Sequence, residues 1–223
     1  MYIEWLKTVH STPELDGGGW LLSQDFANAI SRDHKLAANL LEMGCGPSWI
    51  GLWLNEIGLC SNLHLSDINP DAIACVEKTI KDNNIVAATY LSNMFDSIPE
   101  DIKFDCIVSN PPNYFDIQES HTVCGHLSND IRPSDREWKF HKEFYRQVGD
   151  RLAEDGVIYI SEVDMYSDTV TILGEVYDQR LCPAIDDFKD MIATSGLKIK
   201  DISLMVEATK EAGFPLHILK VGK

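Results

Sequence analysis

Residues 41–48, LEMGCGPS, decide the fold because they join an apolar run to a segment with helical spacing. Residues 37–43 (AANLLEM) are typical of a buried strand, and residues 49–57 carry apolar side chains at the period of a helix. Gly44 and Gly46 let the backbone between the two segments turn sharply and approach a ligand closely. A strand, a glycine turn and a helix in this order predict the first unit of an open α/β sheet. Ligands bind to such sheets at the carboxyl ends of the strands.

The rest of the chain continues this alternation. Asn69 is a candidate N-cap and Pro70 suits the first position of a helix. Two closing strands joined by a short turn are expected to pair antiparallel at the sheet edge. The pattern predicts a doubly wound α/β fold with a mostly parallel seven-stranded sheet and a C-terminal antiparallel hairpin. The further strands are expected at 63–67, 88–91, 104–108, 157–163, 197–206 and 215–221, and the further helices at 24–31 (with Ser23 as its cap), 70–83, 135–153 and 185–195.

Length and composition indicate one domain. The chain has 223 residues, of which 44% are hydrophobic, so we assign a single domain to residues 37–223 and an N-terminal extension or lid to residues 1–36. The formal net charge is −16, which disfavours the electrostatic attraction that most nucleic-acid binders use. Six cysteines without CxxC spacing predict reduced thiols and a cytoplasmic location. The absence of an eighteen-residue apolar run predicts no membrane span, and nothing in the composition assigns an oligomeric state.

An acidic residue, Asp67, ends the second predicted strand. A carboxylate at this position can accept hydrogen bonds from both hydroxyls of a ribose. A dinucleotide is disfavoured as the source of that ribose, because the third glycine of a GxGxxG fingerprint would fall at Trp49, and an indole there should block close packing of helix on strand. A nicotinamide-dependent dehydrogenase remains an alternative, as does a simple solvated aspartate.

A second polar motif follows the fourth predicted strand, where residues 105–115 read DCIVSNPPNYF. The strand ends at Asn110, and two prolines stiffen the loop beyond it. Asn110 is therefore expected at the same edge of the sheet as the glycine turn. Its amide oxygen and the carbonyl of Pro111 can both accept hydrogen bonds from an NH2 group.

The glycine turn resembles the first motif of class I S-adenosylmethionine-dependent methyltransferases, which have a Rossmann-like fold. The resemblance implies that Glu42, Gly44, Cys45 and Gly46 surround the methionine part of S-adenosylmethionine. Ser48 stands where the family often has a further glycine.

The same resemblance assigns the rest of the cofactor site. It implies that Asp67 binds the ribose and that Ile68 packs near the adenine. Asn93 stands where the family usually has an aspartate that contacts the adenine amine, and an asparagine can both accept from that amine and donate to a ring nitrogen. A plain loop asparagine is the alternative.

The Asn-Pro-Pro sequence is similar to the Asn-Pro-Pro-Tyr motif of methyltransferases that modify planar nitrogens, either glutamine amides in proteins or exocyclic amines of adenine and guanine. The resemblance implies catalytic roles for Asn110, Pro111 and Pro112, with Asn110 also bordering the cofactor. Asn113 stands where the family has an aromatic residue. We expect either that Tyr114 stacks on the acceptor instead, or that the acceptor lies outside those known classes.

The predicted function is S-adenosylmethionine-dependent N-methylation of an amide or amine nitrogen in a protein side chain or small molecule. Methylation of an exocyclic amine in RNA or DNA is the alternative, followed by a dehydrogenase and a non-catalytic cofactor-binding subunit. The polar loop 116–137 is expected to carry specificity. It contains His121, Cys124 and His126, but we assign no metal site because no further close ligand is evident.

Overall fold

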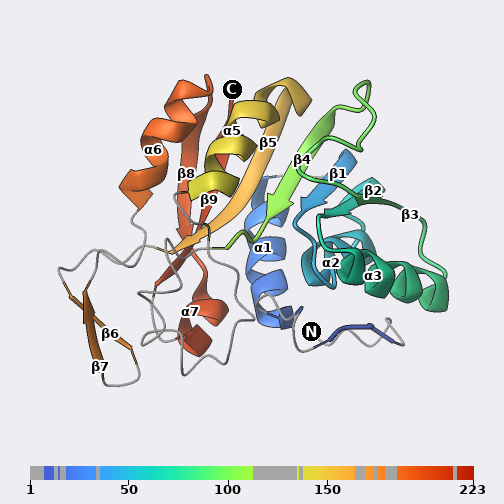
Figure 1. Cartoon of the computed structure of the whole chain (residues 1–223), viewed down its shortest axis with the longest axis horizontal. Helices are drawn as coiled ribbons and strands as arrows, with labels where there is room; N and C mark the ends of the chain where they lie inside the picture. The colour runs from blue at the N-terminus through green and yellow to red at the C-terminus, as the bar shows by residue number, and fades with distance from the viewer. Residues whose placement is uncertain are drawn as a thin grey trace.

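Seven strands form one mixed sheet in the order β3-β2-β1-β4-β5-β9-β8 (Figure 1). The computed structural model describes residues 8–12, 15, 19–33, 36–112, 135, 138–163, 169–172, 175–178, 185–212 and 215–223. Strands β1 to β5 pair parallel, whereas β9 pairs antiparallel with both β5 and β8. The predicted fold class is therefore confirmed. The strands are β1 (Ala37–Met43), β2 (Cys60–Asp67), β3 (Ala87–Leu91), β4 (Phe104–Ser109), β5 (Leu152–Val163), β8 (Lys198–Leu204) and β9 (Leu216–Gly222).

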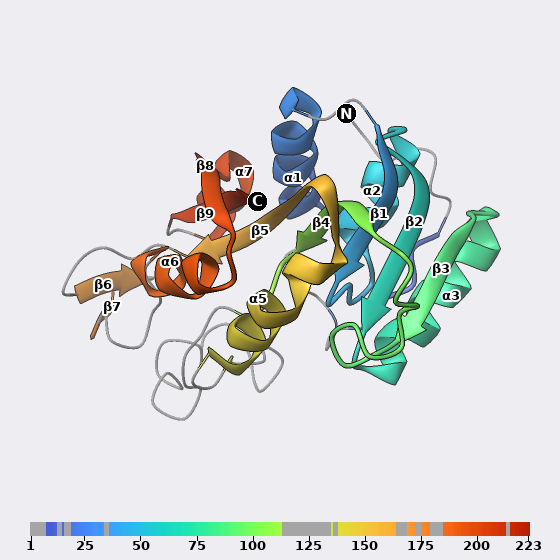
Figure 2. The same cartoon turned by 90° about the horizontal axis from the view of Figure 1, so that it is seen from above.

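Helices cover both faces of the sheet, and Figure 2 shows α1 on the side opposite α5 and α6. One apolar core takes side chains from α1, α2, α3 and α7, including Phe26, Leu54 and Val76. The other core takes side chains from α5 and α6, including Phe144 and Phe188. The helices are α1 (Gly19–Asp33), α2 (Trp49–Glu56), α3 (Pro70–Asn83), α5 (Lys139–Arg151), α6 (Ile185–Thr194) and α7 (Val206–Ala212).

Local signals set the ends of α3, as the sequence predicts. The side chain of Asn69 accepts a hydrogen bond from the backbone N–H of Asp71 at 2.9 Å, and Pro70 occupies the first turn. The helix ends at Asn83, and the C-cap Asn84 takes the left-handed conformation (φ 56°) that Asn tolerates. The entry into α3 fixes the backbone that directly follows Asp67.

Two predicted helix starts are wrong. Ser23 is not an N-cap, because α1 already begins at Gly19 and Ser23 lies buried inside it. The cause is tertiary packing, since Leu22 and Phe26 lie one helical turn apart and both enter the core. Helix α5 begins at Lys139 rather than at residue 135. Asp135 lies outside the helix and acts on its first turn through its side chain.

The C-terminal strands pair antiparallel as expected, but they are not joined by a short turn. Helix α7 lies between β8 and β9, and the carboxylate of Asp25 in α1 accepts hydrogen bonds from the N–H groups of Glu207 and Ala208 at its start, each at 2.9 Å. A two-stranded antiparallel sheet, β6 (Thr169–Ile172) with β7 (Glu175–Asp178), was not predicted.

The strand order places a topological switch point between β1 and β4. From β1 the chain proceeds through β2 to β3 on one side, and β4 continues to β5 on the other. In open α/β sheets, such a switch point is where ligands bind, at the carboxyl ends of the strands. Both sequence motifs, the glycine turn and Asn-Pro-Pro, follow these two strands. In the described part of the chain, no helix has the length and apolarity needed to cross a membrane.

Candidate active site

The register of the sheet aligns the predicted site residues along its carboxyl edge. Met43 of β1 pairs with Ser66 of β2 on one side and with Ser109 of β4 on the other. Ser109 in turn pairs with Ile160 of β5. The residues that follow each of these positions therefore lie side by side, namely Gly44, Asp67, Asn110 and Ser161. After the roles that the resemblance implies for them, we call the β1–β2 part the cofactor side and the β4–β5 part the acceptor side.

Glu42 holds the glycine turn from inside the protein. Its side chain is 3% exposed and accepts hydrogen bonds from the Ser48 hydroxyl at 2.5 Å and from the N–H of Gly51 at 2.8 Å. Burial raises the pKa of Glu42 from 4.5 to about 7, against the opposing effect of these hydrogen bonds. Glu42 therefore braces the loop from behind.

The backbone of the turn explains its residues. Gly44 and Gly46 have φ of +65° and +50°, and Ser48 also lies in the left-handed region with φ 60°. Such a conformation is uncommon for a residue with a side chain, and the hydroxyl bond to Glu42 accompanies it here. This is the position at which the resembling family often has glycine.

Gly51 is a site residue that the sequence reasoning missed. A Cβ at this position would lie 2.6 Å from Oε2 of Glu42 and 2.9 Å from a side-chain carbon of Leu65. The close helix-to-strand approach therefore occurs at Gly51, two residues beyond Trp49, where the dinucleotide fingerprint would require its third glycine. The sequence does contain a signal for this packing, because Gly51 interrupts the helical apolar pattern of residues 49–57, and a glycine inside such a pattern often marks close packing.

Asp67 closes the cofactor side. Its two carboxylate oxygens accept hydrogen bonds from the N–H of Gly46 and the N–H of Asn69, each at 2.8 Å. Each carboxylate oxygen has two lone pairs, so hydroxyl donors can be accepted in addition. Asp67 thus links the glycine turn to the entry of α3 and presents a carboxylate at the sheet edge.

The two residues predicted beside the adenine are both exposed. Ile68 is 67% exposed. Asn93 is exposed and donates to Asp96 at 3.4 Å. The preceding residue, Ser92, donates its N–H to the carbonyl of Asp67 at 2.9 Å, which holds the Asn93 turn beside the end of β2.

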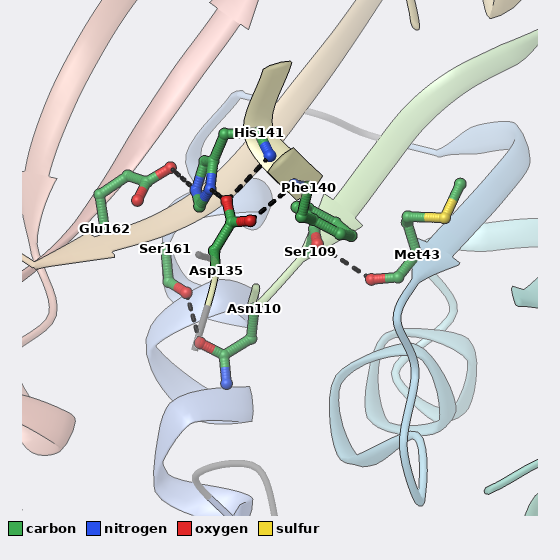
Figure 3. Close-up of polar contacts among 8 residues, drawn as sticks. All are labelled: Met43, Ser109, Asn110, Asp135, Phe140, His141, Ser161 and Glu162. Carbon is green, nitrogen blue, oxygen red and sulfur yellow. Dashed lines mark hydrogen bonds and ion pairs between the residues drawn. The ribbon is translucent and has the colours of Figure 1, made fainter. Parts of the chain in front are cut away.

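The acceptor side centres on Asn110, which is half-buried between β1 and β5 (Figure 3). The hydroxyl of Ser161 donates to Oδ1 of Asn110 at 2.5 Å. The hydroxyl of Ser109 donates to the carbonyl of Met43 at 2.9 Å and ties the end of β4 to β1. Pro111, which follows, is buried and Pro112 is half-buried.

Behind Asn110 lies a buried ionisable network that the sequence reasoning did not identify as part of a site. His141 contacts Asp135 through Nδ1 at 2.5 Å and Glu162 through Nε2 at 3.1 Å (Figure 3). All three side chains are at most 3% exposed. The two carboxylates raise the pKa of His141 to about 9, although burial opposes this. The imidazolium form therefore lies between two acids, and Phe188 stacks on its ring at 4.5 Å.

Several expectations fall on residues outside the described ranges. These are Tyr114, Asn113 and the candidate metal ligands His121, Cys124 and His126. Within the residues that are described, no three His, Cys, Asp or Glu side chains form a group able to hold a metal ion. The lid expected in residues 1–36 stays a prediction, although the carbonyl of Leu15 lies only 3.4 Å from the place of a Cβ on Gly46.

A family model described as "Methyltransferase small domain" matches residues 1–130. The ribosomal RNA small subunit methyltransferase C of Haemophilus ducreyi is 36% identical over 119 residues, which are 53% of this chain and 34% of that protein. The protein of the same name from Photorhabdus laumondii is 36% identical over 110 residues, 49% of this chain and 30% of the relative. The matched part thus spans about a third of the length of these relatives.

Solved structures share the fold. An S-adenosylmethionine-dependent methyltransferase of Leishmania major superposes with a TM-score of 0.65 at 16% identity, covering 99% of this chain and 81% of that chain. An O-methyltransferase of Brevibacillus brevis in complex with S-adenosylhomocysteine gives a TM-score of 0.56 at 13% identity, covering 100% and 84%. At these identities the likeness concerns the fold alone.

Proposed function

Because this chain belongs to the methyltransferase small-domain family, we propose that it transfers a methyl group from S-adenosylmethionine to an exocyclic amine of a nucleobase in RNA. The observation that carries the proposal is the position of Asn110, whose amide lies at the switch point beside the glycine turn. The named relatives are ribosomal RNA methyltransferases, which supports RNA over the protein or small-molecule acceptor that the sequence first favoured.

The cofactor side has the groups that S-adenosylmethionine requires. Asp67 offers a carboxylate for the ribose hydroxyls, and the exposed side chain of Ile68 offers an apolar surface for the adenine. At Gly44 no atom of the described residues lies within 4 Å of the place of a Cβ, which supports binding of the methionine part of the cofactor against this turn. Asn93 would contact the adenine amine. When bound, the cofactor supplies an electrophilic methyl group on a positively charged sulfur.

The acceptor side suits a planar nitrogen. The lone pair of an exocyclic amine is delocalised into the ring, so the nitrogen is a weak nucleophile. Oδ1 of Asn110 and the carbonyl of Pro111 would accept hydrogen bonds from its NH2 group, orienting it and stabilising the positive charge that develops on it. The nitrogen–carbon bond forms as the carbon–sulfur bond breaks. Sulfur keeps the electron pair as a neutral thioether, and the nitrogen loses one proton to water.

A second candidate acceptor is an amide or amine of a protein or small molecule. Two observations favour it, namely the formal net charge of −16 and Asn113 in the place of the aromatic residue that stacks on a base. Repulsion between the acidic surface and phosphates would have to be offset locally for RNA to bind. The two candidates share the cofactor side and Asn110, so they differ only in the acceptor.

Methyl transfer to competing acceptors tests the proposal. The protein would be incubated with S-adenosylmethionine carrying a labelled methyl group, first with unmodified small-subunit ribosomal RNA transcript and then with RNA-free cell protein. We expect label in the RNA and, after digestion, in an N-methylated nucleoside. Label only in the protein fraction would support the second candidate instead. Thermal unfolding with S-adenosylhomocysteine and with NADH provides the cofactor control, because a ligand that binds only the native state raises the melting temperature.

A further inference from the structure

The structure holds the side chain of Asn110 from the neighbouring strand. Ser161 lies near the carboxyl end of β5, one residue beyond Ile160, which pairs with Ser109. Its hydroxyl donates to Oδ1 of Asn110 at 2.5 Å, although 51 positions separate the two residues in the chain. Ser161 is fully buried, so solvent does not compete for this hydroxyl.

This contact bears on the chemistry because the two ends of an asparagine amide are nearly equal in shape but opposite in function. The oxygen accepts hydrogen bonds and the NH2 group donates them. A substrate whose NH2 group receives the methyl group requires the amide oxygen, because that NH2 group donates hydrogen bonds. A carbonyl oxygen accepts two hydrogen bonds, so one from Ser161 and one from the substrate can coexist at Oδ1. Figure 3 shows the nitrogen of the Asn110 amide pointing away from Ser161.

The position of Ser161 is itself fixed by the buried network. The next residue, Glu162, points to the opposite face of β5, as successive strand residues do, and contacts His141 at 3.1 Å. The ring of His141 contacts the carboxylate of Asp135. This carboxylate also accepts hydrogen bonds from the backbone N–H groups of Phe140 at 2.6 Å and His141 at 3.1 Å. The end of β5 is thereby anchored to the first turn of α5 within the apolar core.

We propose that Ser161 is a positioning residue for methyl transfer, whose hydroxyl orients the Asn110 amide with its oxygen available to the acceptor nitrogen. The proposal rests on the proposed function only for the identity of the acceptor. It does not require Ser161 to touch the substrate or the cofactor.

Turnover measurements on Ser161→Ala test the proposal, with the labelled cofactor and unmodified small-subunit ribosomal RNA as the probe. Loss of one hydrogen bond should lower kcat roughly 3- to 10-fold, while the affinity for S-adenosylhomocysteine and the KM for S-adenosylmethionine stay unchanged. Ser161→Thr keeps the hydroxyl and should recover most of the loss. Ser66→Ala is the matched control, because it removes another buried hydroxyl at the same sheet edge and should change kcat less than about twofold.

A double-mutant cycle with Asn110→Ala separates positioning from a general structural effect. If Ser161 acts through Asn110, adding Ser161→Ala to Asn110→Ala should cause little further loss. Equal loss in both backgrounds, or normal turnover of Ser161→Ala beside an inactive Asn110→Ala, would overturn the proposal. An Asn110→Ala protein as active as wild type would instead overturn the proposed function.

A spectroscopic readout removes the dependence on the acceptor. In 15N-labelled protein with S-adenosylhomocysteine, the side-chain NH2 resonances of Asn110 can be assigned by their loss in Asn110→Ala. We expect a single well-dispersed pair in the wild type and shifted or exchange-broadened resonances in Ser161→Ala. Unchanged resonances would contradict the proposal. If Ser161→Ala does not fold, Ser161→Cys, which keeps the size of the side chain but donates weakly, takes its place in both measurements.

Discussion

The two sides of the switch point hold their polar groups in different ways. On the cofactor side, Glu42 receives its hydrogen bonds from Ser48 and Gly51, which lie 6 and 9 positions further along the chain. On the acceptor side, Asn110 depends on Ser161 at a separation of 51, and His141 on Glu162 at a separation of 21. The glycine turn is thus braced within one continuous strand–turn–helix segment and joined to Asp67 at a separation of 21, whereas Asn110 is held by a residue 51 positions away that it meets only in the folded sheet.

The electrostatics of the two sides differ in the same sense. Glu42 is a buried carboxyl held by neutral donors, and burial raises its pKa to about 7. The acceptor side instead pairs a buried histidine with two carboxylates, and their charges raise the pKa of His141 to about 9. The cofactor side therefore tolerates Glu42 as a neutral carboxyl group, whereas the acceptor side keeps the charged imidazolium of His141 inside the protein. The comparison predicts larger effects of mutation on the acceptor side.

Asn replacing His141 should have the largest effect. It leaves Asp135 and Glu162 buried without their cation, and breaking a buried ion pair costs about 3 to 5 kcal/mol of unfolding free energy. The pKa of His141 is raised in the folded state from 6.5 to about 9, so its contribution is complete below pH 6.5 and is lost as pH rises through 9. Urea unfolding at pH 6 and pH 9.5 should show this loss in the wild type and little change in His141→Asn. If the wild type and His141→Asn have equal unfolding free energies at pH 6, the buried charge on the acceptor side does not contribute to stability, and this difference between the acceptor and cofactor sides disappears.

Asn110→Ala should lower kcat by roughly 10²- to 10³-fold, since it removes one preorganised group that stabilises the charge developing in the transition state. Binding of S-adenosylhomocysteine, measured by calorimetry, should stay nearly unchanged. A large loss of binding would instead place Asn110 on the cofactor side and merge the two regions.

Gln replacing Glu42 should alter the pH dependence of stability rather than turnover. The folded-state pKa of Glu42 is raised from 4.5 to about 7. Its stabilising contribution is therefore complete below pH 4.5 and is lost as pH rises through 7, by about 3 kcal/mol at most. Thermal unfolding from pH 4.5 to 8 should show a smaller decline in Glu42→Gln than in the wild type. Parallel curves would mean that Glu42 ionises normally in the folded protein.

Asp67→Ala should show the reverse pattern to Asn110→Ala, with the smallest effect of the four. Losing hydrogen bonds between a carboxylate and ribose hydroxyls should weaken S-adenosylhomocysteine binding roughly 10- to 100-fold, while kcat at saturating cofactor changes little. Asp67→Asn, which keeps one acceptor oxygen, serves as the control. Its affinity for S-adenosylhomocysteine should lie between that of the wild type and that of Asp67→Ala. If kcat falls and binding holds, the assignment of Asp67 to the cofactor side is wrong.

The sequence predicted the fold and the glycine turn because their signals are local. The cap at Asn69, the apolar period of residues 49–57 and the glycines of the turn act within a few residues of themselves. Ser23 and the start of α5 were predicted wrongly for the converse reason. Packing of Leu22 against the core extends α1 toward its N-terminus, and a left-handed Trp138 delays α5. Helix propensity predicts neither effect, because both depend on the tertiary environment of the helix start.

The sequence by itself determined that a carboxylate, a glycine turn and an Asn-Pro-Pro motif follow parallel strands, because each property is written in neighbouring residues. It did not determine what holds them. The tertiary structure decided those contacts. Gly51 leaves room for the carboxyl group of Glu42, and the hydroxyl of Ser161 orients the amide of Asn110. The buried His141 lies between the carboxyl groups of Asp135 and Glu162. The physical reason is that hydrogen bonds and charge pairs depend on distance in space, and strand register brings together residues that no local pattern in the chain connects.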